Sequence, residues 1–379
     1  MTDSKQPSPI EFAAAAVRRL QPYVPGKPLD ELEREYGIRN AVKLASNENP
    51  TGPASAVLEA MQKAVTGINR YPDGAGYYLK QKLAKHLILT TSQLTLGNGS
   101  NDLLVLLAEA FLTPASNAVF SEYAFVVYSL AVQATGAEAR VIPATGATHA
   151  QPLGHDLDAM LAAIDADTRL VFIANPNNPT GSWIAPAALH AFFQQVPAAT
   201  MIVLDEAYCE YISAAAVHES PAWLAEFPNL VITRTFSKIY GLAGLRVGYA
   251  LSSPAIAELL NRIRQPFNIN SVALAGAEAA LDEQDYVLTS RANNVAGMTM
   301  LRDVLAPLDG VRVLPSHGNF VLLQLEQPAA PVYEALLQAG VIVRPVGSYG
   351  LPNYLRVTIG TAAENEAFVR AFVAILQGE

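Results

Sequence analysis

The sequence predicts an α/β fold with two domains. A mostly parallel seven-stranded sheet between helices would form the large domain, and a smaller α+β domain would follow. The chain has 379 residues, more than a single hydrophobic core usually serves, so we expect two cores. Short apolar runs alternate with helical stretches through the middle of the chain, which is typical of a parallel sheet covered on both faces. After about residue 275 a mixed order of helices and strands replaces this alternation.

The first 45 residues are expected to form an N-terminal arm. Apolar residues over 10–20 predict one short helix, and a run rich in Pro and Gly over 22–28 follows it. Helical periodicity resumes over 53–65 and 78–89, on either side of a turn-rich loop at 70–76. We assign residues 46–275 to the large domain, and its first part, to about residue 70, is a candidate to pack with the small domain.

The strands of the large domain are short apolar runs bounded by turn residues. They are expected at 93–96, 118–120, 138–142, 170–174, 201–204, 230–233 and 247–251, the last a candidate antiparallel strand. Helices are expected between them at 103–111, 124–135, 156–165 and 186–196, and a long helical region begins at Pro254. This order places the carboxyl ends of the parallel strands at one edge of the sheet.

The small domain is expected to span residues 276–379. Helical patterns cover 286–306, 331–339 and the segment from residue 363, and strand patterns cover 311–314, 319–324, 341–345 and 354–358. Helices and strands do not alternate regularly there, so the pattern indicates an α+β arrangement.

Composition excludes several classes of function. The net charge of −9 and the lack of a basic stripe argue against nucleic-acid binding. Cys209 is the only cysteine, which excludes an intramolecular disulfide and a cysteine-based zinc site. No histidine pair has metal-ligand spacing, so we expect no metal. The chain starts without a signal-peptide pattern and has no apolar run near the ~20 residues of a membrane span. We therefore expect a soluble, cytoplasmic protein without a membrane or nucleic-acid partner.

Several polar side chains follow predicted strands directly. Asn175, Asp205 and the stretch Thr235–Lys238, which contains Ser237, each come just after a strand. Ligands of doubly wound sheets bind at the carboxyl ends of the strands, so these side chains are expected to share one site. Alone, a lysine is usually a solvated surface residue and a strand-end aspartate often caps a helix. Together and in this order, they indicate a site for pyridoxal 5′-phosphate.

Each residue type has a part in that chemistry. A carboxylate beside the pyridine nitrogen keeps it protonated, and Asp205 is the candidate. Asn178 and Tyr208 would donate hydrogen bonds to the oxygen of the ring hydroxyl. Lys238 would form the Schiff base and, once displaced, carry the proton. We predict Lys238, Asp205 and Tyr208 as the catalytic residues.

The cofactor phosphate needs backbone donors at a helix N-terminus and a fixed cation. Gly99, Ser100 and Asn101 open the helix that follows the first strand of the sheet, and Ser237 and Arg246 would complete the phosphate site. A Gly-x-Gly turn alone is weak evidence of such a site. Phe125 is the first candidate to stack on the cofactor ring and Tyr123 the second, although a purely structural role for the aromatic residue stays open.

These motifs resemble those of the class I and II group of fold-type I pyridoxal phosphate aminotransferases, and within it the histidinol-phosphate aminotransferases. The resemblance runs nearly from end to end. It rests on Pro22-Tyr23-Val-Pro-Gly26, Ser46-Asn47-Glu48-Asn49-Pro50, Arg70-Tyr71-Pro72-Asp73-Gly74, Asn175–Gly181, Asp205-Glu206-Ala207-Tyr208, Thr235–Gly248, Val343-Arg344-Pro345 and Leu355-Arg356.

The resemblance implies a two-step transamination between L-histidinol phosphate and 2-oxoglutarate, which gives imidazole acetol phosphate and L-glutamate in histidine biosynthesis. Arg344 and Arg356 would bind the substrate phosphate, with Asn178 nearby. The resemblance also implies a homodimer. Tyr23 would assist from the neighbouring subunit, and Tyr71 would reach the cofactor phosphate of the partner's site.

Two positions depart from many members of the family. An Ala-Asp pair is frequent where this chain has Ser100-Asn101, and tyrosine is frequent where it has Phe125. Backbone contacts to phosphate tolerate the first change, and the second keeps the stacking face, so neither puts the mechanism in doubt.

Other functions remain open at this point. The nearest alternative is an aromatic amino acid aminotransferase, because a pocket for an imidazole ring beside an arginine could also hold phenylalanine or tyrosine. A phosphothreonine decarboxylase on the same fold comes third. A regulator with a silent aminotransferase-like domain would need a DNA-binding segment, and the residues before 45 are too few and too acidic for one. Arg344 and Arg356 could also be members of surface ion pairs.

Overall fold

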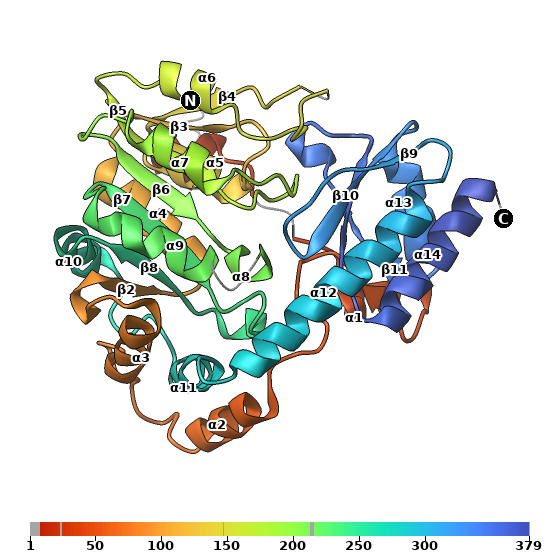
Figure 1. Cartoon of the computed structure of the whole chain (residues 1–379), viewed down its shortest axis with the longest axis horizontal. Helices are drawn as coiled ribbons and strands as arrows, with labels where there is room; N and C mark the ends of the chain where they lie inside the picture. Colours follow the sequence, from red (N-terminus) through yellow and green to blue (C-terminus); the bar gives the residue numbers. More distant parts are fainter. Residues whose placement is uncertain (1–7, 23–24, 147, 213–215, 379) are drawn as a thin grey trace, which may run out of the picture.

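A seven-stranded sheet forms the centre of the larger part of the molecule in the computed structural model, which describes residues 8–22, 25–146, 148–212 and 216–378 (Figure 1). Its order is β2-β8-β7-β6-β5-β3-β4, and only β8 runs antiparallel to its neighbours. The strands are β2 (Leu94–Gly97), β3 (Asn117–Ser121), β4 (Glu138–Ile142), β5 (Thr168–Ala174), β6 (Met201–Asp205), β7 (Leu230–Thr235) and β8 (Gly248–Ser252). The predicted number of strands and the antiparallel last strand are confirmed.

The sheet is covered on both faces because successive strand side chains point to opposite sides. On β5, Val171 and Ile173 enter one core, while Leu170 and Phe172 enter the other. The first core also receives the apolar faces of α2 (Ser55–Val65), α3 (Tyr77–Leu87), α6 (Leu157–Ala162), α7 (Pro186–Phe193) and α11 (Ser271–Ala280). The second receives those of α4 (Ser100–Phe111), α5 (Val126–Ala134) and α10 (Pro254–Ile263).

The C-terminal part has its own sheet and core. Its antiparallel sheet has the order β12-β13-β10-β9, and its hydrophobic cluster is separate from the two beside the large sheet. The strands are β9 (Val311–Val313), β10 (Phe320–Leu325), β12 (Arg344–Pro345) and β13 (Tyr354–Thr358), and the helices are α12 (Gln284–Leu305), α13 (Ala329–Gln338) and α14 (Ala362–Gln377). In Figure 1, α12 runs along the junction of the two parts.

The N-terminal arm differs from the prediction. In place of a helix over 10–20 it has two short 3-10 turns, at Pro9–Phe12 and Val17–Arg19, in which no residue is buried. A short helix without a buried face is unstable in water, which explains the error. A helix that was not predicted, α1 (Leu29–Tyr36), buries Leu32 and ends at Gly37, whose positive φ of 69° suits glycine.

The end of the arm belongs to the C-terminal part. There β1 (Val42–Lys43) pairs in parallel with β11 (Val341–Ile342), and Leu44 enters the C-terminal core. The strand predicted over 341–345 is therefore two strands, β11 and β12, in different sheets. The region after Pro254 is likewise two helices, and α8 (Cys209–Ile212) and α9 (Ala216–Ala222) were not predicted. The division at residues 45 and 275 stays a proposal.

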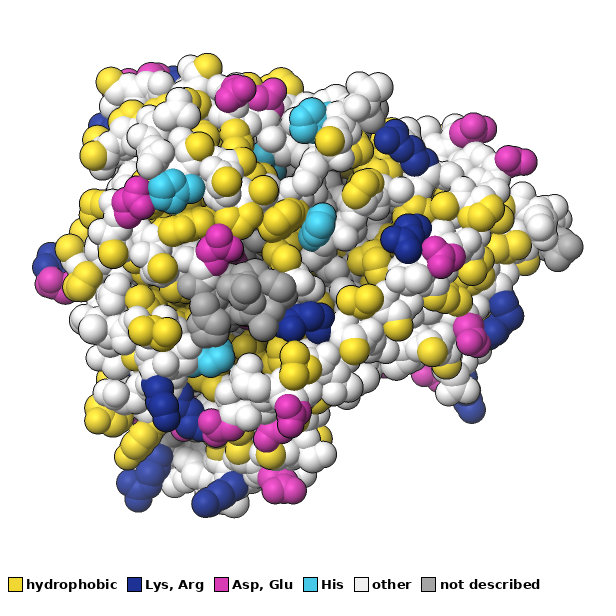
Figure 2. All heavy atoms as spheres, viewed as in Figure 1, with side chains coloured by type: hydrophobic (Ala, Val, Ile, Leu, Met, Phe, Trp, Pro, Cys, Tyr) yellow, Lys and Arg dark blue, Asp and Glu magenta, His cyan; other side chains and the backbone are white. Residues whose placement is uncertain are grey.

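The surface carries charges of both signs. On the face shown in Figure 2, basic and acidic side chains of the described residues are interspersed. Over the same described ranges, no helix is long and apolar enough to cross a membrane.

Candidate active site

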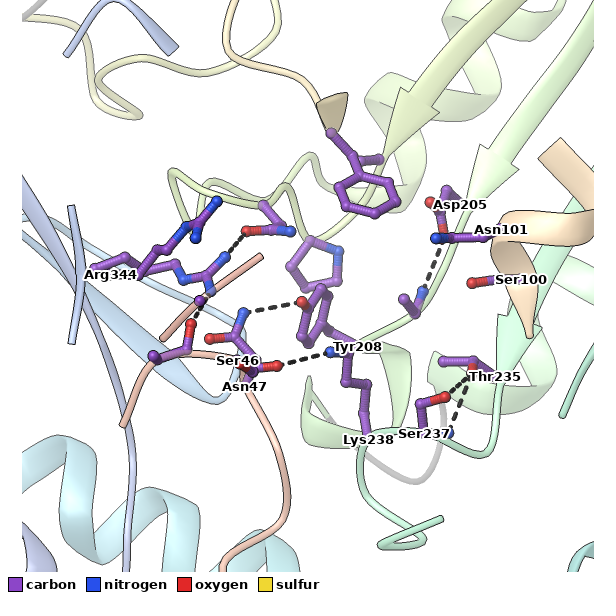
Figure 3. A pocket seen from close by; sticks show the side chains of 18 of the residues that line it. Ser46, Asn47, Ser100, Asn101, Asp205, Tyr208, Thr235, Ser237, Lys238 and Arg344 are labelled. Atoms are coloured by element: carbon purple, nitrogen blue, oxygen red, sulfur yellow. Dashed lines mark hydrogen bonds between the residues drawn. The ribbon is translucent and has the colours of Figure 1, made fainter. Parts of the chain in front are cut away.

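A pocket lies at the carboxyl ends of the parallel strands and faces the C-terminal sheet (Figure 3). Most of the residues predicted for the site line it. These are Ser100, Asn101, Phe125, Asn178, Asp205, Tyr208, Ser237, Lys238, Arg246, Arg344 and Arg356. The structure thus brings together side chains that are up to 256 positions apart in the sequence, as the strand-end argument predicts.

Lys238 comes three positions after the end of β7. Its Nζ donates a hydrogen bond to the carbonyl oxygen of Ser46 at 3.2 Å and lies 5.5 Å from the centre of the Tyr208 ring. Burial lowers the pKa of Lys238 to about 8, and the charges of Arg356 and Arg246 contribute in the same direction. A larger share of this amine is therefore neutral near pH 7 than of an ordinary lysine, which is the form a nucleophile needs.

Asp205 is the last residue of β6, and its carboxylate is held from two directions. Oδ2 accepts a hydrogen bond from the Tyr128 hydroxyl at 2.8 Å, and Oδ1 accepts one from the Ala207 amide at 3.3 Å. Burial raises the pKa of Asp205 to about 6, while both hydrogen bonds oppose that rise. The group is therefore mainly a carboxylate at neutral pH, although buried.

Asn47 holds the phenol of Tyr208. Its Nδ2 donates to the Tyr208 oxygen at 2.9 Å, while its Oδ1 accepts from the Thr358 hydroxyl at 3.0 Å. Burial raises the pKa of Tyr208, and the charge of Arg356 and the hydrogen bond from Asn47 oppose that rise. Because Asn47 acts as the donor, the Tyr208 proton remains available to an acceptor in the pocket.

Two arginines stand directly opposite each other on neighbouring strands of the C-terminal sheet, Arg344 on β12 and Arg356 on β13. Arg356 is 7% exposed. It donates to the Asn178 side-chain oxygen and to the Ala45 carbonyl oxygen, the latter at 2.5 Å. In Figure 3, Arg344 lies at the opposite side of the pocket from Ser100 and Ser237. The pocket therefore has one cationic end supplied by the C-terminal sheet.

A second anion-binding end lies at the start of α4. Gly99 precedes this helix with φ 78°, and a Cβ added there would come within 2.5 Å of Nη2 of Arg246. Only glycine therefore lets the guanidinium approach the helix N-terminus this closely. Arg246 also donates to the Ser237 hydroxyl at 3.3 Å, and Thr235 donates to the same oxygen at 2.9 Å. Helix amides, two hydroxyls and a guanidinium together suit a phosphate group.

Some predicted residues do not line the pocket. Gly99 is one of them, although its lack of a side chain lets Arg246 approach the start of α4. The Tyr71 ring is 82% exposed and stacks on Phe267 with 4.7 Å between the ring centres, away from the pocket of its own chain. Tyr123, the second choice for the stacking ring, packs in a small cluster near Leu314, while Phe125 lines the pocket. Tyr23 lies outside the described residues.

Sequence reasoning missed the parts of Asn47 and Tyr128. Asn47 stands in the Ser46–Pro50 motif, which was used for the resemblance without a role for its side chain. Tyr128 follows Phe125, the residue just before α5, by three positions, so the two aromatic residues could have been considered together. Neither the contact from Asn47 to Tyr208 nor that from Tyr128 to Asp205 could be read from the linear sequence, because each joins residues at least 77 positions apart.

Comparison with known proteins identifies the protein family of this chain. A lysine and a carboxylate at strand ends, between a phosphate-binding helix start and a pair of arginines, are what a transaminase site requires. Residues 39–372 match the family Aminotransferase class I and II. The chain belongs to this family.

Within the family, the similar curated proteins share one description. The chain is 55% identical over 369 residues to histidinol-phosphate aminotransferase 2 of Pseudomonas aeruginosa, covering 97% of this chain and 98% of that protein. It is 52% identical, with the same coverage of both, to the histidinol-phosphate aminotransferase of Methylobacillus flagellatus.

Solved structures agree in fold. The structure of histidinol-phosphate aminotransferase from Sinorhizobium meliloti in complex with pyridoxal-5′-phosphate matches with a TM-score of 0.88 at 30% identity, over 97% of this chain and 98% of that one. L-threonine-O-3-phosphate decarboxylase from Porphyromonas gingivalis matches with a TM-score of 0.75 at 24% identity and 89% coverage of this chain, so that it shares the fold. The predicted fold class is confirmed.

Proposed function

We propose that this chain is a pyridoxal phosphate-dependent transaminase of histidine biosynthesis. It transfers the amino group of L-histidinol phosphate to 2-oxoglutarate and yields imidazole acetol phosphate and L-glutamate. The observation that carries the proposal is a single pocket with Lys238 and Asp205 on one side and the Arg344–Arg356 pair on the other. Full-length relatives at 55% and 52% identity, both described as histidinol-phosphate aminotransferases, support the choice of substrate.

The residues present suit pyridoxal phosphate. The start of α4, with Ser100 and Asn101, would hold the phosphate together with Ser237 and Arg246, whose guanidinium Gly99 allows to approach. Asp205 would face the ring nitrogen. When bound, the cofactor supplies an electron sink for charge that develops at the substrate α-carbon.

The ring would also contact three further side chains. Tyr208 and Asn178 would donate to the ring hydroxyl oxygen, and Phe125 would stack on the ring face. Asn47 orients Tyr208, and Arg356 orients Asn178, because each makes a direct hydrogen bond to its neighbour.

Proton transfer and charge balance would depend on side chains of the chain itself. The neutral amine of Lys238 accepts the proton from the substrate α-carbon and returns it on the other side of the transfer. A pKa of about 8 suits this exchange, because a base and its conjugate acid are both available near neutral pH. Asp205 stays ionised and balances the positive ring nitrogen.

The arginine pair sets the substrate class. Histidinol phosphate presents a phosphate, whereas glutamate and 2-oxoglutarate present two carboxylates each, so the pocket must accept anions of different shape. Arg344 and Arg356 lie side by side on β12 and β13, and guanidinium groups bind carboxylate and phosphate in two-pronged fashion. The same pair can therefore serve both half-reactions.

The working unit is proposed to be a homodimer. The exposed ring of Tyr71 stacks on Phe267, which is itself 45% exposed, so the two rings form an apolar surface outside their own pocket. That placement supports a role for Tyr71 at the cofactor phosphate of a partner subunit. Light scattering should give twice the mass of the 40.4 kDa chain. Tyr23 as an aid to substrate binding and a cytoplasmic location stay predictions.

The substrate assignment is tested by comparing kcat/KM for L-histidinol phosphate and phenylalanine. Purified protein should absorb in the visible through bound cofactor, and Lys238→Ala should lose that band and turnover. Histidinol phosphate should be preferred. If phenylalanine is better by more than about tenfold, or ~1.4 kcal/mol in transition-state binding, the enzyme is an aromatic aminotransferase.

The role of Arg344 in substrate binding is tested by comparing two substrates. Arg344→Ala should lower kcat/KM for histidinol phosphate far more than for phenylalanine, because only the former carries a phosphate. Arg302→Ala, a largely exposed arginine on α12, is the matched control and should change neither. Equal losses for the two substrates would remove Arg344 from the specificity role.

A further inference from the structure

Tyr128 is a buried ionisable residue that the proposed mechanism does not use. It lies on α5, is fully buried, and its hydroxyl donates to Oδ2 of Asp205 at 2.8 Å. It does not line the pocket, so it would not contact the cofactor. Any function must therefore pass through Asp205 or through its ring contacts.

Three aromatic rings fix the position of the Tyr128 ring. It stacks on Phe172 of β5 with 4.8 Å between centres and 13° between planes. Phe120 of β3 and Phe125 contact it edge-on, with centres 6.3 and 6.0 Å away. Phe125 also lines the pocket. The hydroxyl thus has one available direction, toward Asp205, and the ring also supports the residue predicted to stack on the cofactor.

The surroundings of Asp205 show why this hydrogen bond matters. Burial raises the pKa of Asp205, and the hydrogen bond from Tyr128 is the largest opposing contribution, ahead of that from the Ala207 amide. Glu206 next to it adds negative charge. Lys238 and Tyr208 face it from the pocket side, each with a pKa that responds to the Asp205 charge. The neutral phenol therefore stabilises the charged form of Asp205 from behind.

We propose that Tyr128 is a positioning residue that holds Asp205 ionised and directed toward the ring nitrogen of the cofactor, a role that rests on the proposed pyridoxal phosphate function. The two contacts on Asp205 use one lone pair on each oxygen, and the carboxylate keeps further acceptor capacity for the pocket side. Without the phenol, the carboxylate becomes a stronger base and draws the proton away from the ring nitrogen. The cofactor is then bound more weakly and is a poorer electron sink.

The test compares Tyr128→Phe with Tyr249→Phe. Both remove one hydroxyl from a buried tyrosine and keep the ring, but Tyr249 lies on β8 and does not line the pocket. Each protein is loaded with pyridoxal phosphate carrying 15N at the ring nitrogen. The 15N chemical shift reports ring protonation, and dialysis reports the rate of cofactor release, so neither readout needs turnover.

In Tyr128→Phe, the 15N resonance should move toward the value of unprotonated pyridine, and cofactor release should be about tenfold faster, the loss expected for a hydrogen bond to a charged group. Tyr249→Phe should match the wild type in both. If Tyr128→Phe also matches the wild type, the residue has only a packing role. If the wild-type protein binds no pyridoxal phosphate, the proposed function fails as well, so the two failures are distinguishable.

A second replacement covers the case in which Tyr128→Phe does not fold. Incorporation of 3,5-difluorotyrosine at position 128 keeps the hydroxyl and makes it a stronger donor. The 15N resonance should then move toward the protonated value. An unchanged resonance would overturn the proposal.

Discussion

A buried ion pair that includes Glu206, the neighbour of Asp205, allows a quantitative prediction. Arg234 on β7 is completely buried, and its Nε and Nη2 donate to the same oxygen of Glu206 at 2.9 and 2.7 Å. The Ser220 hydroxyl donates to that oxygen at 2.8 Å. Glu206 follows Asp205 immediately, so the pair anchors the end of β6 from which the site is built. We predict that Glu206→Gln destabilises the protein because it leaves the Arg234 charge buried and uncompensated.

The size of the effect follows from the surroundings. Removing one partner of a buried ion pair costs about 3–5 kcal/mol. Glu210 lies near enough for the charge of Arg234 to lower its pKa, although burial raises that pKa to about 7 overall. Ionisation of Glu210 would replace part of the lost negative charge, so we expect the lower end, about 3 kcal/mol. The unfolding entropy of a 379-residue chain is on the order of 0.8 kcal/mol/K. The expected decrease in Tm is therefore about 4 °C.

Scanning calorimetry of the cofactor-loaded protein measures this change. The matched control is Glu258→Gln, because Glu258 pairs with Arg262 at 2.6 Å but both side chains are more than 60% exposed. Its Tm should change by less than about 1 °C. The double replacement Glu206→Leu with Arg234→Met should recover most of the loss, since no charge then remains unpaired. If Glu206→Gln has no larger effect than Glu258→Gln, the pair does not stabilise the fold.

Two further predictions concern groups near the site. Asn47→Asp replaces the amide donor with a carboxylate, so that Tyr208 must donate its proton to residue 47. The kcat/KM for histidinol phosphate should therefore fall about tenfold or more. An unchanged kcat/KM would contradict the assigned direction of that hydrogen bond. The pKa of buried Glu210 is raised from 4.5 to about 7, so its stabilising contribution is complete below pH 4.5 and is lost as pH rises through 7. In urea denaturation, Glu210→Gln should therefore have a higher free energy of unfolding than the wild type at pH 8 and an equal one near pH 4.5. If the two proteins differ by the same amount at both pH values, the Glu210 carboxyl does not titrate in this range.

Most residues that line the candidate site could be predicted from the sequence because the sheet is mostly parallel. Asp205 ends a strand and Lys238 follows one, and the apolar pattern of both strands could be recognised in the sequence. The carboxyl ends of parallel strands lie at the same edge of the sheet. Gly99 and Ser100 could be assigned to an anion site on the same basis, since helices that follow strands start at that edge. For these residues, the order along the chain was sufficient to predict proximity.

The supporting contacts could not be predicted in this way. Asn47 reaches Tyr208 only because β1 pairs with β11 and carries the following segment back beside the large sheet. A two-residue strand has too few side chains to show a pattern, so the sequence gives no sign of that pairing. Tyr128 was visible in the sequence as one of several aromatic residues, but its contact with Asp205 depends on the packing of α5 against β5 and β6, which periodicity does not specify.

The hydrogen bonds between the two sheets bear on how the enzyme discriminates substrates. Asp205 ends a strand of the large sheet and Lys238 follows another, whereas the two arginines belong to the C-terminal sheet. Arg356 nevertheless donates to Asn178, and Thr358 of the same strand donates to Asn47, which in turn donates to Tyr208. A substrate anion that draws Arg356 toward it therefore acts directly on Asn178, one of the two groups that would contact the cofactor hydroxyl. Substitutions at Arg356 should for this reason lower kcat even for substrates without a phosphate, whereas those at Arg344 should act mainly on selectivity.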